Sequence, residues 1–389
     1  MTRAARLALA DGRVFHGRSC GAPLDVAAEV VFNTSHTGYQ EVLTDPSYRG
    51  QAVVFTVPIL GIYGVAGAGD DQAEAPQAAA LVCREMSRRA SSWRAQEPLP
   101  AFLARHGVPA IEGVDTRSLV RHLRERGAVL GVLSVGEEPD AELVERARHA
   151  PPMRGRDLAS EVSCATPYEW TEGFDTATTP WGTAGPVERC AAGRRVVVVD
   201  LGVKRDILRH LAARGCEVSV VPLGTPLEAI LERDPAGVLL SNGPGDPAAV
   251  GRGIELARGL LACEGLPVYG VCLGYQLISL AIGAKTIKMK FGHRGGNHPV
   301  RDLERGKVLI SAHNHGFAVD PSSLAGTPLL ATHESLFDGT LEGVRHRELP
   351  VRAVQFHPEA GPGPHEAETF FDDFVRDLAV APAERAREG

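Results

Sequence analysis

The sequence lacks the features of a secreted, membrane-bound or nucleic-acid-binding protein. Its seven cysteines are scattered and form no C-x-x-C pair, which argues against a disulfide framework and a zinc knuckle and favours a reducing compartment. The formal net charge of -7 offers no positive surface to nucleic acid or to an anionic membrane. We therefore expect a cytoplasmic protein with neither a nucleic-acid nor a membrane partner.

The sequence also lacks a clear membrane span. One uncharged stretch, residues 266–284, is long enough to raise the question, but it contains Pro267, Tyr275 and Gln276. A buried strand that leads into a buried helix explains this stretch better.

Motifs for nucleotides and metals are incomplete. Residues 283–286 lack the spacing of a P-loop, and residues 67–69 are not followed by the third glycine of a dinucleotide fingerprint. His313 and His315 could chelate an ion from one strand face, but no cysteine or carboxylate cluster completes a ligand set in the sequence. We expect no metal and no cofactor in this chain.

The chain of 389 residues, 44% of them hydrophobic, is long enough for two hydrophobic cores. Alternating apolar and turn residues over 7–15 predict a hairpin, and helical patterns follow at 98–106 and 115–126. Residues 172–193 are rich in Thr, Gly, Ala and Pro, as in a linker. These patterns predict an N-terminal domain at 1–150, a linker region at 151–193, a second domain at 194–380 and a frayed tail at 381–389.

The second domain alternates strand and helix patterns. Residues 195–200 form the pattern of a fully buried strand, and residues 204–214 form an amphipathic helix that ends at Gly215. Further strands are expected at 217–221, 237–241 and 267–271. This alternation predicts an α/β fold, a doubly wound and mostly parallel sheet with helices on both faces, beside a smaller N-terminal α/β domain.

A cysteine occupies a tight turn of the second domain. The apolar stretch 267–271 is followed by Cys272, which Gly270 and Gly274 bracket before an apolar helix begins. A sharp strand-to-helix turn leaves no room for side chains at the two glycines and lifts the sulfur above the sheet edge. The helix N-terminus then favours thiolate. A buried cysteine that only fills the core is the alternative at this point.

A histidine and a glutamate stand at the end of another expected strand. His357 and Glu359 are two positions apart, so in an extended chain they face the same side. Glu359 can orient the imidazole of His357, which can take a proton from Cys272 and return it to a leaving amine. Such a pair alone is more often a surface pair, but together with the cysteine turn it predicts a thiol-dependent site.

A loop rich in Gly and Pro, residues 241–247, follows the strand expected at 237–241. It would lie at the carboxyl edge of the sheet, where open α/β sheets bind ligands, and its backbone amides could hold an oxyanion. An ordinary turn is the alternative.

The cysteine turn, the His357–Glu359 pair and the loop at 241–247 occur together in this sequence. Nearly the whole chain resembles the small, glutamine-hydrolysing subunits of carbamoyl phosphate synthetases, a family of class I glutamine amidotransferases. The resemblance covers both domains and is carried by residues 29–48, 239–247, 288–299 and 314–320. Amidotransferases in general lack the first of these segments.

The resemblance implies roles for individual residues. Cys272 would be the nucleophile, His357 the base and Glu359 the residue that orients the base. The backbone amides of Gly243 and Leu273 would line the oxyanion hole. The remaining positions that would hold L-glutamine are Ser47, which would reach in from the first domain, and Gly245, Gln276, Asn314, Gly316 and Phe317.

The resemblance also implies a reaction and a partner. Hydrolysis of L-glutamine would pass through a γ-glutamyl thioester and release ammonia, which would travel through a tunnel to a large synthetase subunit. That subunit would bind ATP and bicarbonate, and carbamoyl phosphate would serve arginine and pyrimidine synthesis.

Three features depart from the family pattern. Tyr275 stands where the family usually has histidine, His313 stands where glutamine is common, and residues 58–65 drift from the usual sequence. Two alternatives therefore stay open: a paralogue that feeds ammonia to another synthetase, and a non-catalytic paralogue that binds glutamine or acts as a scaffold.

Overall fold

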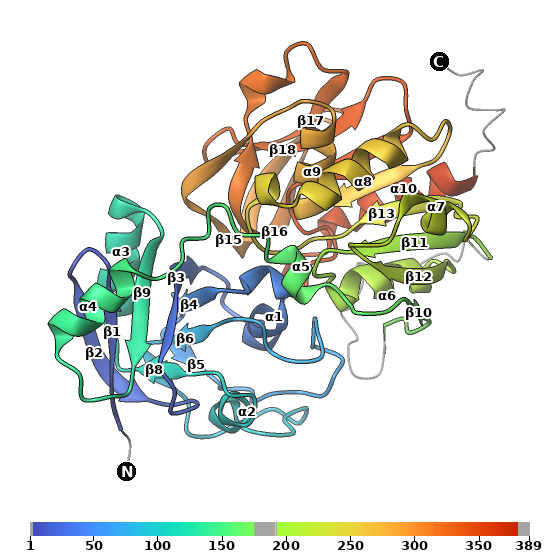
Figure 1. Cartoon of the computed structure of the whole chain (residues 1–389). Helices are drawn as coiled ribbons and strands as arrows, with labels where there is room; N and C mark the ends of the chain where they lie inside the picture. The colour runs from blue at the N-terminus through green and yellow to red at the C-terminus, as the bar shows by residue number, and fades with distance from the viewer. Residues whose placement is uncertain (1–2, 175–190, 192, 380–389) are drawn as a thin grey trace. The chain divides into compact units, whose positions relative to one another are not determined.

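The structure, a computed structural model, describes residues 3–174, 191 and 193–379 (Figure 1). The chain divides into two compact units. The first comprises Met1–Arg154 and Lys290–Gly295, and the second comprises Gly155–Met289 and Gly296–Gly389. The frayed tail predicted at 381–389 lies outside the described residues.

The first unit is built on a closed barrel of mixed parallel and antiparallel strands. Around the barrel the order is β1-β2-β8-β6-β4-β3-β9. The barrel strands are β1 (Ala4–Leu9), β2 (Val14–Ser19), β3 (Val26–Asn33), β4 (Gln51–Phe55), β6 (Ala80–Val82), β8 (Ala110–Glu112) and β9 (Val129–Ser134). The short strands β5 (Ile59–Leu60) and β7 (Glu85–Met86) pair in a separate sheet.

The hairpin predicted near the N-terminus is confirmed, because β1 and β2 pair antiparallel around a turn at Gly12. The predicted helices are confirmed as α2 (Leu99–Arg105) and α3 (Thr116–Arg126). The carboxylate of Asp115 caps α3 by accepting a hydrogen bond from the Ser118 amide, and the helix ends at Gly127, where φ is 104°. The unit also contains α1 (Tyr39–Thr44), a 3₁₀ turn (Pro46–Tyr48) and α4 (Asp140–Arg148).

The second unit contains a ten-stranded sheet in the order β10-β12-β11-β13-β14-β19-β18-β17-β15-β16. Its central strands, β12-β11-β13-β14-β19, pair in parallel. The strands are β10 (Tyr168–Trp170), β11 (Arg195–Asp200), β12 (Glu217–Pro222), β13 (Gly237–Leu240), β14 (Val268–Val271), β15 (Thr286–Asp302), β16 (Lys307–Val319), β17 (Leu329–Ser335), β18 (Leu341–His346) and β19 (Val351–Val354).

Helices cover both faces of this sheet, as predicted (Figure 1). Successive residues of β11 alternate between two buried clusters: Val197 and Val199 pack with α8 and α9, and Val196 and Val198 pack with α6 and α10. The four valines at 196–199 are buried on both faces and form one continuous apolar run, so the strand could be predicted from the sequence. The helices are α5 (Ala159–Val162), α6 (Arg205–Ala213), α7 (Leu227–Leu231), α8 (Gly251–Leu261), α9 (Leu273–Ala281) and α10 (Thr369–Ala379).

Residues 151–193, predicted as a linker region, include regular elements where they are described. Within them the structure places α5 and β10, and β10 pairs antiparallel with β12. The stretch 175–190 lies outside the described residues. Among the helices that the structure does describe, none has the length and the apolar character to cross a membrane.

Candidate active site

Cys272 lies between β14 and α9, in the turn that the sequence predicted. Its backbone has φ 53° and ψ -100°, a conformation that a residue with a side chain rarely adopts. The turn is fixed on one side by a hydrogen bond of 2.8 Å from the Cys272 amide to the Val354 carbonyl oxygen in β19. Strained backbone at the end of a central strand is typical of a functional position.

The two glycines that bracket Cys272 are required by close packing. A Cβ atom at Gly274 would lie 2.1 Å from the Leu240 carbonyl oxygen, and one at Gly270 would lie 2.7 Å from the carbonyl carbon of Gly274. Both distances are far below van der Waals contact. The glycines therefore allow α9 to start directly against the ends of β13 and β14, which places the sulfur at the carboxyl edge of the sheet.

His357 and Glu359 follow β19, the strand next to β14. The Nδ1 atom of His357 lies 2.6 Å from Oε1 of Glu359, and both side chains are buried. The His357 amide donates to the Ala312 carbonyl oxygen at 2.8 Å, which ties this segment to β16. Because Nδ1 is engaged by Glu359, Nε2 is the ring nitrogen left for the thiol of Cys272, which lies beside the ring. The structure thus brings Cys272, His357 and Glu359 together.

Lys204 is a fourth member of this cluster, and the sequence analysis missed it. Its buried Nζ lies 2.9 Å from Oε1 of Glu359 and donates to the Ala360 carbonyl oxygen at 2.5 Å. The residue stands just before α6, where the positive end of the helix dipole disfavours a lysine. A lysine at the start of an expected helix is a sequence signal of an unusual position, but it does not identify the partner of the lysine.

The charges in this cluster stabilise one another. Burial alone would raise the pKa of Glu359, but the Lys204 ammonium and the His357 ring hold it below its usual range. Burial likewise opposes a charged imidazole, yet the Glu359 carboxylate raises the pKa of His357 above its usual range. The cluster therefore keeps Glu359 ionised and favours a protonated His357.

Gly243 and Leu273, whose backbone amides are the predicted oxyanion donors, pack against each other. Leu273 is the first residue of α9, so its N–H belongs to the donors that a helix N-terminus leaves without an intrahelical acceptor. A Cβ atom at Gly243 would lie 2.9 Å from Cδ2 of Leu273 and 2.0 Å from the Leu201 carbonyl oxygen. At Gly245, φ is 100° and a Cβ would lie 2.7 Å from the Arg156 carbonyl oxygen. The loop therefore needs both glycines.

The residues predicted to hold glutamine from α9 and β16 form one network with the cysteine. Gln276 donates to the Phe317 carbonyl oxygen at 2.9 Å and to Oε1 of Gln355 at 2.8 Å. Gln355 in turn lies with Nε2 3.5 Å from the sulfur of Cys272, and the Asn314 carbonyl oxygen lies 3.8 Å from the same sulfur. Gly316 lies between Asn314 and Phe317 on β16.

Gln355 was also missed by the sequence analysis. It stands two positions before His357, with the same spacing that separates His357 from Glu359, and is completely buried. A polar residue in register with the histidine, directly after β19, was the signal that could have identified it.

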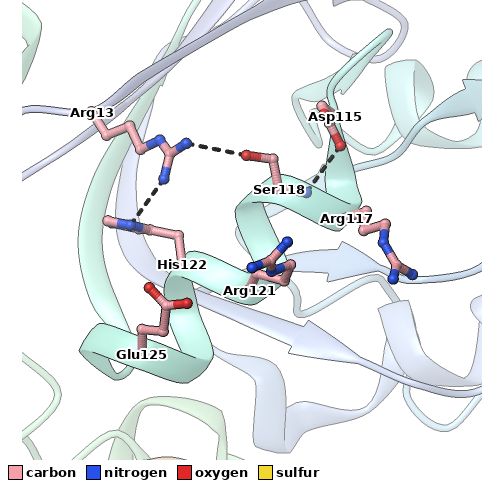
Figure 2. A pocket seen from close by; sticks show the side chains of 7 residues that line it. All are labelled: Arg13, Asp115, Arg117, Ser118, Arg121, His122 and Glu125. Carbon is pink, nitrogen blue, oxygen red and sulfur yellow. Dashed lines mark hydrogen bonds between the residues drawn. The ribbon is translucent and has the colours of Figure 1, made fainter.

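Ser47 lies in the first unit, in the 3₁₀ turn after α1. Its amide donates to Oδ1 of Asp45 at 2.8 Å, and the residue is buried. Its part in binding glutamine stays a prediction. A pocket of the first unit is lined by residues outside the predicted site: Arg13, Asp115, Arg117, Ser118, Arg121, His122 and Glu125 (Figure 2).

Tyr275 and His313, the two departures from the family pattern, both point into the interior. The Tyr275 hydroxyl donates to the Leu341 carbonyl oxygen at 3.4 Å. His313 lies beside His315 and the carboxylate of Glu342, which comes from β18. No carboxylate could be matched to the two histidines from the sequence, because Glu342 is distant in the chain and only the fold brings β18 close to β16.

Comparison with protein families identifies the class of protein to which each unit is similar. A family described as class-I glutamine amidotransferase matches residues 197–377, the region that contains Cys272, His357 and Glu359. A second family, described as the carbamoyl-phosphate synthase small chain, CPSase domain, matches residues 7–133 in the first unit.

Individual relatives match both units together. The carbamoyl phosphate synthase small chain of Thioalkalivibrio sulfidiphilus is 50% identical and aligns over 95% of this chain and 96% of its own. Those of Thermosynechococcus vestitus and Escherichia coli K12 are 49% and 48% identical, over 97% and 96% of this chain and 97% of each relative. The chain belongs to the family of carbamoyl phosphate synthase small chains.

Proposed function

We propose that this chain is the glutaminase subunit of a carbamoyl phosphate synthase. It hydrolyses L-glutamine in the cytoplasm and passes the ammonia to a large, ATP-using subunit. The observation that carries the proposal is the buried cluster at the edge of the central sheet, where Cys272 in its strained turn lies beside the His357–Glu359 pair. The membership of the chain in the small-chain family supports the choice of synthase.

The reaction begins when the Cys272 sulfur attacks the side-chain amide carbon of glutamine. His357, which holds the thiol proton as an imidazolium that the Glu359 carboxylate stabilises, delivers this proton to the amide nitrogen, which leaves as ammonia while a γ-glutamyl thioester remains on Cys272. Backbone amides of Gly243 and Leu273 stabilise the oxyanion of each tetrahedral intermediate. Water, deprotonated by His357, then cleaves the thioester, releases glutamate and regenerates the thiol.

The other residues of the cluster position this chemistry. Glu359 holds the His357 ring with Nε2 toward the sulfur, and Lys204 holds Glu359 in turn. Gln276 is hydrogen-bonded to Gln355 and to the backbone of Phe317, which fixes this segment of β16. Asn314, Gly316 and Phe317 of the segment would hold the substrate, together with Gly245 and Ser47.

The test is the Cys272→Ser variant. We expect glutamate production from glutamine to fall to background, because an alcohol is a far weaker nucleophile than a thiol in this setting. The measurement is glutamate and ammonia release by the purified chain, with trapping of the wild-type thiol by a glutamine-like electrophile. Cys263→Ser, at a part-buried thiol just after α8, is the matched control and should keep wild-type turnover.

The same experiment separates the alternatives. A folded Cys272→Ser variant with full activity would refute the proposal. A wild-type chain that neither makes glutamate nor reacts with the electrophile would favour the non-catalytic, glutamine-binding paralogue instead.

A further inference from the structure

Three ionisable side chains of the second unit form a buried cluster that the proposed glutaminase reaction does not use. His313 and His315 come from β16, and Glu342 comes from β18. Their side chains are 0%, 1% and 0% exposed. Burial of a carboxylate with two imidazoles is costly unless charge and hydrogen bonding compensate it, so the cluster calls for a physical explanation.

The spacing of the ligand atoms fits a small metal ion. Nδ1 of His313 and Nε2 of His315 are 3.3 Å apart. The Glu342 carboxylate oxygens lie 3.7 Å from the first nitrogen and 3.8 Å from the second, beyond ordinary hydrogen-bond length. Around a tetrahedral zinc ion with bonds of about 2.0–2.1 Å, two ligand atoms stand about 3.3–3.4 Å apart. Small side-chain movements would bring the two longer distances, from Glu342 to the histidine nitrogens, to this value.

The second ring nitrogen of each histidine is already held. Nδ1 of His315 lies 2.9 Å from the Phe317 carbonyl oxygen, which can only accept, so this nitrogen carries the hydrogen. In the neutral ring Nε2 then has a lone pair, and it faces His313 and Glu342. Nε2 of His313 lies 2.9 Å from the Ser311 hydroxyl, which can accept its hydrogen. Metal-binding histidines typically make such outer hydrogen bonds, which fix the ring and its tautomer.

We propose that His313, His315 and Glu342 bind a divalent transition-metal ion, and that zinc is the ion this donor set favours. Two imidazole nitrogens and one carboxylate oxygen are a common zinc ligand set, whereas magnesium and calcium prefer oxygen ligands alone. A bound cation would also place positive charge next to the buried Glu342 carboxylate. The site does not depend on the proposed glutaminase function.

The test uses the full chain and the metal alone. Because the ligands are buried, the protein is unfolded, stripped with a chelator and refolded with or without ZnCl₂ before free metal is removed. We expect wild-type protein to retain one zinc per chain. His313→Gln and Glu342→Gln should each weaken zinc binding at least about tenfold, since a change in the outer shell alone costs that much.

Matched controls and a second measurement keep the test decisive. His149→Gln and Glu348→Gln, at exposed positions, should retain zinc like the wild type. X-ray absorption of the wild-type zinc protein should show nitrogen and oxygen neighbours without sulfur, and this readout does not require either variant to fold. No retained zinc in the wild type, equal retention in folded His313→Gln and Glu342→Gln, or a sulfur neighbour would each overturn the proposal. The cluster would then be a chain of hydrogen bonds from Ser311 through both histidines.

Discussion

The buried carboxylate of Glu359 is in contact with two groups that can carry positive charge. Oε1 lies 2.6 Å from the His357 ring and 2.9 Å from the Lys204 ammonium. An ionised carboxylate in a dry interior persists only when such partners replace water. In the proposed reaction, the orientation of the His357 imidazole beside Cys272 would therefore depend on Lys204.

Replacement of Lys204 by Met should test this dependence. At neutral pH we expect a loss of about 3–5 kcal/mol in the free energy of unfolding, because Glu359 keeps its charge but loses a buried partner. We also expect kcat for glutamine hydrolysis to fall about tenfold to a hundredfold with little change in KM, because the imidazole is misoriented. Urea unfolding and steady-state kinetics measure the two effects.

The pH dependence distinguishes this role from a loss of packing. The folded pKa of Glu359 lies below its ordinary value of 4.5, so the ionised group stabilises the fold above about pH 4.5 and loses this effect as the pH falls further. The stability gap between wild type and Lys204→Met should therefore shrink in acid. A gap that stays constant with pH would assign Lys204 to packing alone. Lys307→Met, at an exposed site, should show no gap.

Residue types with a fixed local spacing could be predicted from the sequence. Cys272 between two glycines and His357 two positions before Glu359 are patterns that one short segment contains. Lys204 and Glu342 could not be assigned in this way, because each acts on a partner in another element and only the folded sheet brings them together.

At the scale of elements, the junction between β14 and α9 determines where the sulfur lies. The helix begins one residue after Cys272, and its first turn packs directly on the end of β13 through Gly274. Any side chain at this glycine must push the helix away from the sheet. The turn would then relax, and the sulfur would move relative to His357.

Gly274→Ala should therefore be harmful although alanine favours helices. We expect destabilisation of about 1–3 kcal/mol from overpacking and a loss of glutaminase activity larger than the loss of stability explains. Thermal unfolding and glutamate release are the measurements. Gly251→Ala, where an added Cβ meets nothing within 4 Å, is the matched control in α8. Equal behaviour of the two variants would contradict this account of the junction.

The central strands were predicted almost to the residue, whereas the barrel was not predicted at all. β11 matches the prediction, β12, β13 and β14 differ from it by one residue at one end, and α6 differs by one residue at each end. Strands buried on both faces are continuous apolar runs that stand out. The barrel closes through pairings such as β2 with β8 and β3 with β9, which join distant segments of mixed composition. No local pattern specifies such pairings.

At the scale of the whole molecule, the chain combines a class I amidotransferase unit with a unit typical of one synthase family. The proposed triad of Cys272, His357 and Glu359 lies entirely in the second unit. The first unit therefore suggests a specific client for the ammonia. The alternative client, another synthetase, makes a different prediction about what binds the chain.

The client can be identified by reconstitution with the large carbamoyl phosphate synthase subunit from the same source. We expect a stable complex in which ATP and bicarbonate accelerate glutamine hydrolysis, because coupling lets the partner's conformational state govern turnover in this chain. In that complex, Cys272→Ser should abolish carbamoyl phosphate synthesis from glutamine but leave synthesis from added ammonia intact. A chain with full glutaminase activity that neither binds the large subunit nor responds to ATP would point to another client.

Loss of the ammonia-dependent reaction in the Cys272→Ser complex would instead show that Cys272 affects the structure of the complex. Because glutamine and ammonia enter the same synthesis at different points, the ratio of the two rates assigns the defect to one subunit.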